Sequence, residues 1–187
     1  MWNMVTVDGY FEGTKSWDIG WHDIGWGDEL DRLGIEQTNA ADMILFGRVT
    51  YEGMAAYWPA ATDAVAGIMN RIPKVVFSKT LQRADWNNTR LVRDDAEREV
   101  SRLKQQPGKD MLIFGSAKLS ASLTRAGLID EYRLGLNPVA LGAGTPLFKE
   151  GLKMKLLEAR PLKTGCVVLR YEPVLPPPYS GVKAPND

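Results

Sequence analysis

Short apolar runs recur along the chain, and segments with helical spacing separate them. Runs rich in Val, Ile, Leu and Phe lie at residues 1–7, 43–46, 73–80, 91–92 and 111–114. Runs of this kind are typical of strands covered on both faces, as in a parallel sheet. Helices are predicted between them at 28–39, 47–57, 63–69, 96–106 and 117–125, with caps at Asp28, Asp63 and either Asp94 or Asp95.

The pattern changes near the C-terminus. Residues 152–161 and 165–173 are predicted to form two strands joined by three residues, most simply an antiparallel hairpin at the sheet edge. Together with the preceding alternation of strands and helices, this predicts an α/β three-layer sandwich with a mainly parallel central sheet. Residues 1–173 contain no linker and are expected to form one domain, whereas residues 174–187 form a proline-rich tail that we expect to be loosely held.

A glycine turn connects the strand at 111–114 to the helix at 117–125. Gly115 and Ser116 form this turn, and Gly127 ends the helix. Backbone N–H groups at a helix start are unpaired and carry the positive end of the peptide dipoles, so a pyrophosphate can bind there without a lysine. Taken alone, one such turn is also ordinary connection chemistry in an α/β domain.

Two further strands end in polar or glycine junctions. Gly47-Arg48-Val49-Thr50 follows one apolar run, and Ser78-Lys79-Thr80 ends the next. An arginine, two hydroxyls, an ammonium group and a helix start together suit a dinucleotide with an extra phosphate, as in NADPH. No acidic residue follows the main glycine turn where a ribose 2′-hydroxyl would be bound, which argues against NADH.

Residues 13–27 combine glycines with three tryptophans and the only histidine. The glycines argue against a stable helix, and three tryptophans are not expected to lie wholly in water, so we predict a loop that folds against a ligand cleft or a partner subunit. His22 is expected to have a packing role or to contact substrate. Without a second histidine or a nearby cysteine, a histidine-based metal site is not supported.

Composition narrows the classes of protein. The 187 residues carry 23 basic and 23 acidic side chains, so nothing attracts nucleic acid globally, and no window approaches the roughly 18 apolar residues of a membrane span. The lone Cys166 excludes a disulfide framework and zinc binding by thiolates, which predicts a reducing, cytoplasmic setting. The low net charge permits a homo-oligomer, and we expect a homodimer.

Four motifs occur in an order that resembles one superfamily. FGRVTYEGM, VVFSKTL, FGSAKLSASL and LIDEYRLGLNPVALGAGTPLF, within a stretch from Val5 to Tyr171, resemble the dihydrofolate reductase-like proteins. More narrowly, the chain resembles the reductase domain of bacterial riboflavin-biosynthesis deaminase-reductases and their small stand-alone relatives. The resemblance implies a dihydrofolate reductase-like fold and NADPH as cofactor. Gly115 is followed here by Ser116 instead of a second glycine, so the substrate is less defined than the cofactor.

The resemblance also assigns roles to residues. Residues 47–50 would lie near the adenosine phosphates, 78–79 near the 2′-phosphate, and 115–119 at the pyrophosphate, while the strand at Val5 would pass beside the nicotinamide. Gly142 and Gly144 would lie close to the cofactor, or would serve plain turn chemistry. The candidate cofactor-binding residues are Val5, Gly47, Arg48, Val49, Thr50, Ser78, Lys79, Gly115, Ser116, Ala117, Lys118, Leu119, Gly142 and Gly144.

Hydride transfer to a heterocycle needs one proton, for which Asp8, Asp31 and water are candidates. Asp8 is otherwise a turn residue, and Asp31 a solvated helix acid. Trp21, Trp26 and Trp58 are candidate substrate contacts. A carboxyl group buried among tryptophans would have a raised pKa and could then donate a proton near neutral pH. The sequence therefore predicts an NADPH-dependent reductase of an aminouracil-ribosyl or pterin-like substrate. The alternatives are a dimeric ligand-binding protein without turnover and a structural protein with a tryptophan-rich interface.

Overall fold

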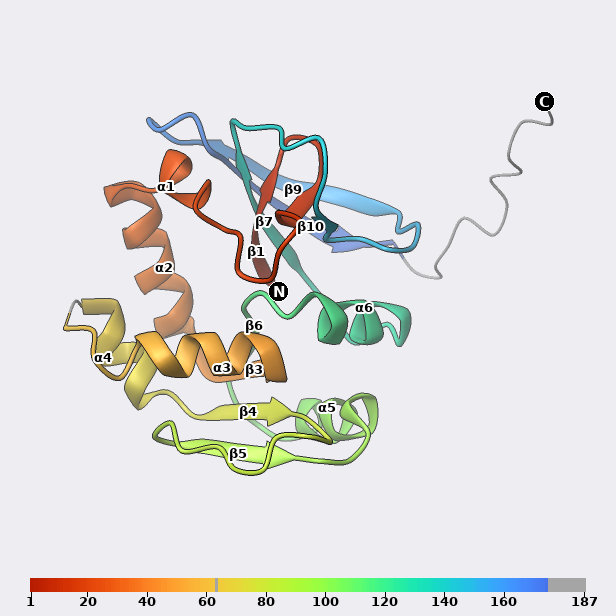
Figure 1. The fold of residues 1–187 in the computed structure, drawn as a ribbon. Helices are drawn as coiled ribbons and strands as arrows, with labels where there is room; N and C mark the ends of the chain where they lie inside the picture. The colour runs from red at the N-terminus through yellow and green to blue at the C-terminus, as the bar shows by residue number, and fades with distance from the viewer. Residues whose placement is uncertain (63, 175–187) are drawn as a thin grey trace.

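Four parallel strands form one half of the central sheet. The computed structural model describes residues 1–62 and 64–174 (Figure 1). The strands of this half are β3 (Ala41–Gly47), β4 (Lys74–Phe77), β5 (Thr89–Val92) and β6 (Asp110–Ile113), in the spatial order β5-β4-β3-β6. All three pairings are parallel, as predicted for continuous apolar runs.

The second half is mixed. It contains β1 (Trp2–Thr6), β7 (Tyr132–Asn137), β9 (Met154–Pro161) and β10 (Val167–Pro173), in the order β1-β7-β10-β9. β1 and β7 are parallel, whereas β10 is antiparallel to both β7 and β9, so the predicted C-terminal edge hairpin is confirmed. Among the described residues, one parallel bridge between Trp2 and Phe114 joins the two halves.

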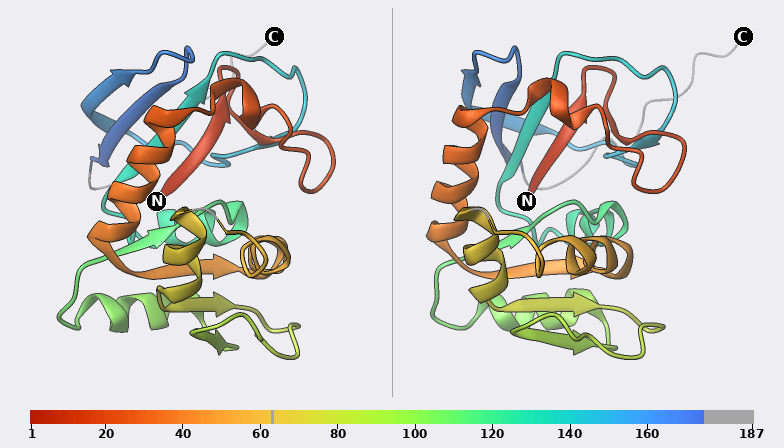
Figure 2. Two further views of the ribbon diagram at one scale, coloured as in Figure 1. Left: turned by 90° about the vertical axis from the view of Figure 1, so that its left-hand side faces the viewer. Right: turned by 60° about the vertical axis from the view of Figure 1, so that its left-hand side comes forward.

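Helices cover both faces of this sheet and make the predicted three layers (Figures 1 and 2). α5 (Ala96–Lys104) and α6 (Ala117–Arg125) lie on one face. The other face is covered by α2 (Asp28–Ala40), α3 (Arg48–Tyr57) and α4 (Ala64–Arg71). Apart from the central sheet, a short antiparallel ribbon pairs β2 (Tyr10–Glu12) with β8 (Thr145–Pro146). In β3, Leu45 faces the α5 and α6 side and Phe46 the opposite side, which explains the continuous apolar run.

The structure corrects two local predictions. Residues 13–27 are not wholly loop, because α1 (His22–Gly25) forms one helical turn. Asp28 is the first residue of α2 and not its cap, since Gly27 occupies the cap position and no side chain bonds there. The predicted cap at Asp63 and the tail after Val174 lie outside the described residues.

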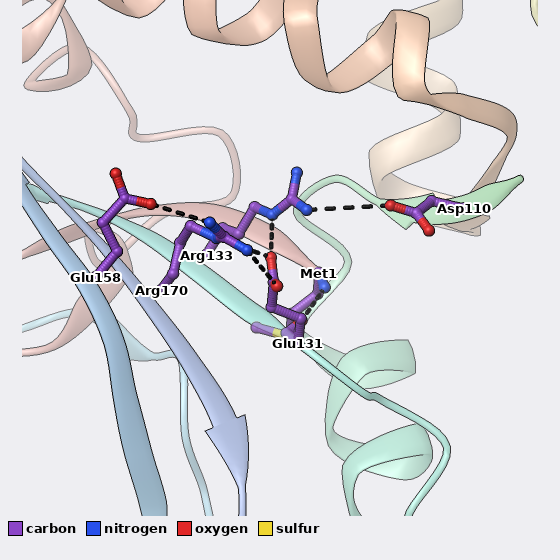
Figure 3. Close-up of polar contacts among 6 residues, drawn as sticks. All are labelled: Met1, Asp110, Glu131, Arg133, Glu158 and Arg170. Carbon is purple, nitrogen blue, oxygen red and sulfur yellow. Dashed lines mark hydrogen bonds and ion pairs between the residues drawn. The ribbon is translucent and has the colours of Figure 1, made fainter.

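An ion network crosses the second half of the sheet and reaches β6 (Figure 3). The carboxylate of Glu131 accepts hydrogen bonds from Arg133 and Arg170, and Arg170 also pairs with Glu158 at 2.9 Å. Arg133 lies 4.0 Å from Asp110 of β6. Burial opposes ionisation of Glu131, but the two arginines outweigh it and lower its pKa to about 2.

Candidate active site

The three predicted junctions meet at one edge of the sheet. β4, β3 and β6 are adjacent parallel strands, so residues 78–80, 47–50 and 115–119 follow their carboxyl ends side by side. Ligands of open α/β sheets bind outside the carboxyl ends of the strands. The structure therefore brings together segments that lie up to 72 residues apart in the chain, from Gly47 to Leu119.

Direct hydrogen bonds tie the start of α3 to the start of α6. The Ser116 hydroxyl accepts from the backbone N–H of Gly47 at 3.0 Å, and the Ser116 N–H donates to the Thr50 hydroxyl, also at 3.0 Å. Gly115 and Ser116 both have left-handed backbone, with φ of 59° and 61°. A side chain on Gly115 would also meet the Thr50 methyl group, because an added Cβ would lie 3.2 Å from it. The turn is thus fixed by its partners and by its backbone.

Both of these helix starts lack a side-chain cap. Neither Gly47 nor Ser116 caps its helix through a side chain, and neither first turn contains an acidic residue. α5 differs, because the Asp95 carboxylate accepts from the N–H groups of Glu97 and Arg98. Uncapped N–H groups at a helix start bind anions. α3 and α6 therefore present two adjoining helix starts whose N–H groups no side chain caps, whereas the N–H groups at the start of α5 are bound by the Asp95 carboxylate.

An open groove of about 600 Å³ adjoins the start of α3. It is lined by Arg48, Glu52, Thr80, Leu81, Gln82 and Arg83. Arg48 pairs with Glu52 at 3.0 Å, and both side chains are nearly half exposed. Ser78 and Lys79 do not line this groove: the Ser78 hydroxyl accepts from the N–H of Leu81, and Lys79 is exposed.

Sequence reasoning named Arg48 but missed two other arginines at this groove. Arg83 lines it, and Arg93 holds its far wall by donating to the backbone oxygens of Leu81 and Gln82 at 2.7 and 2.8 Å. Arg93 directly follows β5, the fourth parallel strand. Extending the search for polar residues to every apolar run would have found it, whereas Arg83 lies in irregular structure that the hydrophobic pattern does not mark.

Asp8 organises a loop. Its carboxylate accepts from the Thr6 hydroxyl and from the N–H groups of Leu141 and Gly142, at 3.0 and 2.8 Å for the last two. The hydrogen bond from Thr6, followed by that from Gly142, lowers the pKa of Asp8. A carboxylate held ionised in this way is a poor proton donor at neutral pH.

The two loop glycines both have structural reasons to be glycine. Gly142 has a φ of 72°, and an added Cβ on Gly144 would lie 2.4 Å from the backbone oxygen of Glu12. Val5 lies in β1 with its side chain buried in the core on the α5 and α6 face. Within the described part of the chain, β1 is joined to the parallel half of the sheet only through the bridge from Trp2 to Phe114, directly after β6, so the backbone of β1 beyond this bridge is not paired with β6.

The candidate tryptophans have different environments. Trp21 is buried, with an indole N–H that has no partner among the described residues. Trp58 is partly buried, and its N–H points at the Met54 sulfur at 3.0 Å. Trp26 is 48% exposed and donates to the Asp31 carboxylate at 2.9 Å, so Asp31 of α2 is engaged by a side chain from the segment at 13–27.

His22 packs edge-on against the Trp21 ring, with ring centroids 4.4 Å apart. Burial lowers the pKa of His22 to about 4, so the imidazole is neutral near pH 7. Its Nε2 has no hydrogen-bond partner in the described part of the protein. Across residues 1–62 and 64–174, no three His, Cys, Asp or Glu side chains are placed to hold a metal ion, and no helix has the length and apolar character to cross a bilayer.

Comparison with known proteins decides the family. The family described as RibD C-terminal domain matches residues 1–168. The chain belongs to the RibD C-terminal domain family. One relative is the uncharacterized protein YyaP of Bacillus subtilis strain 168, which is 33% identical to this chain over 179 residues. The match covers 89% of this chain and 90% of YyaP.

Solved structures show that this RibD C-terminal domain has the dihydrofolate reductase-like fold. A putative riboflavin biosynthesis protein from Shewanella sp. PV-4 has a TM-score of 0.75 at 18% identity, covering 92% of this chain and 97% of its own. The Thermotoga maritima diaminohydroxyphosphoribosylaminopyrimidine deaminase and 5-amino-6-(5-phosphoribosylamino)uracil reductase has a TM-score of 0.65 at 14% sequence identity. The match covers 92% of this chain and 55% of the Thermotoga chain. Enterococcus faecalis dihydrofolate reductase complexed with NADP(H) has a TM-score of 0.59 at 11% sequence identity. The match covers 92% of this chain and 94% of the reductase chain. The resemblance inferred from the sequence motifs is confirmed.

Proposed function

We propose that this member of the RibD C-terminal domain family is an NADPH-dependent reductase that transfers a hydride to a planar heterocycle of the aminouracil or pterin class. The observation that carries the proposal is the pair of uncapped helix starts joined through Gly47, Thr50 and Ser116. They fit a pyrophosphate, because each offers unpaired N–H groups and no competing carboxylate. The arginine groove beside them fits a further phosphate.

NADPH, when bound, supplies the hydride. The protein's own residues then have three tasks, which are to hold the phosphates, to orient the ring systems and to exclude water. The N–H groups of residues 117–119 and 48–50 hold anions at the helix starts, and Arg48 and Arg83 provide positive charge in the groove. Since Asp8 is stabilised in its ionised form, we assign proton delivery to Asp31 or to water, with Asp31 becoming available when Trp26 releases it.

One charge reversal tests the cofactor site. Lys118 is exposed in the first turn of α6, and Lys118→Asp would place a carboxylate among the N–H groups assigned to the pyrophosphate. An acid at this position favours the helix but repels phosphate. We expect wild-type protein to bind NADPH stoichiometrically in calorimetry at near-physiological salt, and Lys118→Asp to bind about tenfold more weakly, or worse, with no loss of thermal stability.

Arg98→Asp is the matched control, because Arg98 is exposed in the first turn of α5, a helix start that Asp95 already caps. It should leave NADPH affinity unchanged. No detectable NADPH binding by the wild-type protein would refute the proposed function, and equal losses in both variants would refute the assignment of the pyrophosphate to α6.

A binding protein without turnover is the second candidate. The observation that favours it is that both candidate proton donors are engaged, Asp8 by Thr6 and the loop at 141–142, and Asp31 by Trp26. Stopped-flow loss of nicotinamide absorbance with a panel of pterins, pyrimidines and folates separates the two functions. Oxidation of NADPH with any of them supports the reductase, while bound NADPH that survives the whole panel supports the binding protein.

A further inference from the structure

The indole of Trp17 lies face down on Gly53 of α3. A Cβ built on Gly53 would lie 1.9 Å from Cζ2 of Trp17, and 2.3 and 2.5 Å from the two atoms bonded to it, Cε2 and Cη2. Similar distances to one ring atom and both its neighbours place Gly53 over the face of the ring and not beyond its edge. Only glycine leaves room for the indole at this height above the helix.

The loop that carries Trp17 is held in shape by its own contacts. Trp17 has left-handed backbone, with a φ of 63°, and its N–H donates to the Glu12 carboxylate at 3.0 Å. The N–H of Gly13 closes the loop by donating to the backbone oxygen of Asp18 at 2.9 Å. A non-glycine residue in this conformation is uncommon and persists where surrounding contacts fix it. The ring is therefore presented on a preorganised support.

The seat of Trp17 borders the proposed cofactor site. Gly53 follows Thr50 by three residues and so lies on the same face of α3, one turn further along. Thr50 accepts from the N–H of Ser116, and the Phe11 ring lies beside Gly115, where an added Cβ would be 3.4 Å away. The indole is thus seated one helical turn from Thr50, the residue that binds the Gly115–Ser116 turn.

The surface around the indole is apolar and accessible. Val49 and Tyr57 lie four residues before and after Gly53, on the same stripe of α3, and are 44% and 60% exposed. Trp17 itself stays 39% exposed. Exposed apolar groups gathered beside a polar site mark binding surfaces. An aromatic ring with one face supported and the other accessible is the arrangement that stacks on planar heterocycles.

We propose that Trp17, seated on Gly53, is the specificity-determining residue that stacks on the planar heterocycle of the substrate. This inference rests on the proposed function for its substrate class, but not on NADPH binding. It assigns to Gly53 a role that helix formation does not explain, since glycine is a poor helix former inside α3. The ring selects flat, unsaturated substrates, and non-planar ones gain nothing from it.

Three substitutions, two at Trp17 and one at Gly53, test the proposal from the two sides of the contact. The probes are pterin and 5-aminouracil, titrated calorimetrically with and without NADP⁺. Trp17→Leu removes the ring and should weaken binding of the probes about tenfold, whereas Trp17→Phe keeps a smaller ring and should restore most of the affinity. Gly53→Ala leaves Trp17 unchanged but displaces it, so its loss of affinity should match that of Trp17→Leu.

Matched controls separate binding from folding. Gly67→Ala adds the same methyl group inside α4, where nothing lies within 4 Å, and Ile24→Ala trims another exposed apolar residue close to the Trp17 loop. Both should leave probe affinity within twofold. Because alanine favours a helix over glycine, Gly53→Ala should melt no lower than the wild type, so a lower melting temperature with intact probe binding would indicate a structural role and overturn the proposal.

The outcomes distinguish this inference from the proposed function. Probe binding that falls in Trp17→Leu and Gly53→Ala while NADP⁺ affinity is unchanged supports the inference. Equal probe binding in the wild type and both variants overturns the inference, and so does a wild-type protein that binds neither probe. In both cases the cofactor assignment is decided by the NADP⁺ titration alone. Trp17-dependent probe binding without any NADP⁺ binding would reject the reductase and retain the stacking residue.

Discussion

In the proposed NADPH complex, Arg48 would exchange a partner within its own helix for a phosphate. Its side chain is 45% exposed, and the guanidinium pairs with Glu52 one turn along α3. An exposed pair of this kind contributes about 0–1 kcal/mol, whereas an arginine that binds a phosphate through two hydrogen bonds makes a stronger, directional contact. Exchange of Glu52 for a phosphate therefore costs little. Lys79, exposed and outside the groove lining, adds charge without a fixed geometry.

Replacing both Arg48 and Lys79 with alanine should reduce the preference for NADPH over NADH by about tenfold, because only NADPH carries the 2′-phosphate that these charges would bind. The preference is measured as the ratio of the two dissociation constants. Arg98→Ala removes an exposed arginine from α5 and should leave the ratio unchanged. An unchanged ratio in the double variant would remove both residues from the 2′-phosphate site.

Lys74 illustrates a residue whose role no local pattern reveals. At the start of β4 it is 1% exposed, and its ammonium donates to the backbone oxygens of Met69 and Ile72, each at 2.7 Å, at the end of α4. It also lies 4.4 Å from the centre of the Trp86 ring. Burial lowers its pKa to about 8. A lysine at the start of a strand is ordinarily expected in solvent, whereas Lys74 turns back and caps the end of the helix that precedes its strand.

At the scale of elements, the three helices that follow parallel strands divide by how they begin. α5 begins with a carboxylate cap, and α3 and α6 do not. A cap stabilises a helix whether or not a ligand is present, so an uncapped start gives up stability that an anion can restore. The presence of a carboxylate cap therefore distinguishes the structural junction before α5 from the proposed functional junctions before α3 and α6 better than the number of glycines does.

Asp95→Ala should destabilise the protein by about 1 kcal/mol, because it removes the acceptor for the N–H groups of Glu97 and Arg98. Chemical denaturation measures the change. Asp94→Ala alters the adjacent exposed acid, which caps nothing, and should change stability by less than about 0.5 kcal/mol. If the two variants were equally stable, the cap would contribute nothing to folding.

Sequence patterns predicted elements well where the signal was local. The helix at 117–125 has the predicted bounds, since a left-handed Gly115 precedes it and a left-handed Gly127 follows it. The junctions at 47–50, 78–80 and 115–119 could also be predicted, because each directly follows an apolar strand and parallel strands end at the same edge of a sheet. The contacts of Arg93 and Trp17 were not predictable, since each depends on a partner from a distant segment. A glycine inside a helix does not by itself indicate that an aromatic ring packs over it.

At the scale of the whole molecule, the ion network couples acid stability to the second half of the sheet. The pKa of Glu131 is about 2 in the folded protein, against an ordinary value of 4.5. A carboxyl group with a depressed folded pKa contributes stability above its unfolded pKa and loses it as the pH falls through the folded one. The contribution is therefore complete above pH 4.5 and disappears between about pH 4.5 and 2.

Glu131→Gln should lower the free energy of unfolding by about 1–2 kcal/mol at pH 7 and should flatten its decline between pH 4.5 and 2. Urea denaturation at a series of pH values measures both effects. Glu172→Gln breaks only the exposed pair with Lys155 and serves as control. A variant with the same acid profile as the wild type would show that other carboxylates govern acid unfolding.

The topology of the central sheet also orders its assembly. β3, β4, β5 and β6 come from one continuous stretch, residues 41–113, so this half can form from neighbours in the chain. β1 cannot pair until β7, beginning at Tyr132, has been synthesised, because Trp2 lies opposite Arg133. Such long-range pairing closes a large loop and is intrinsically slow. β1 is therefore made well before its partner strand but pairs only after it, so the backbone beside the proposed nicotinamide site is completed late in folding.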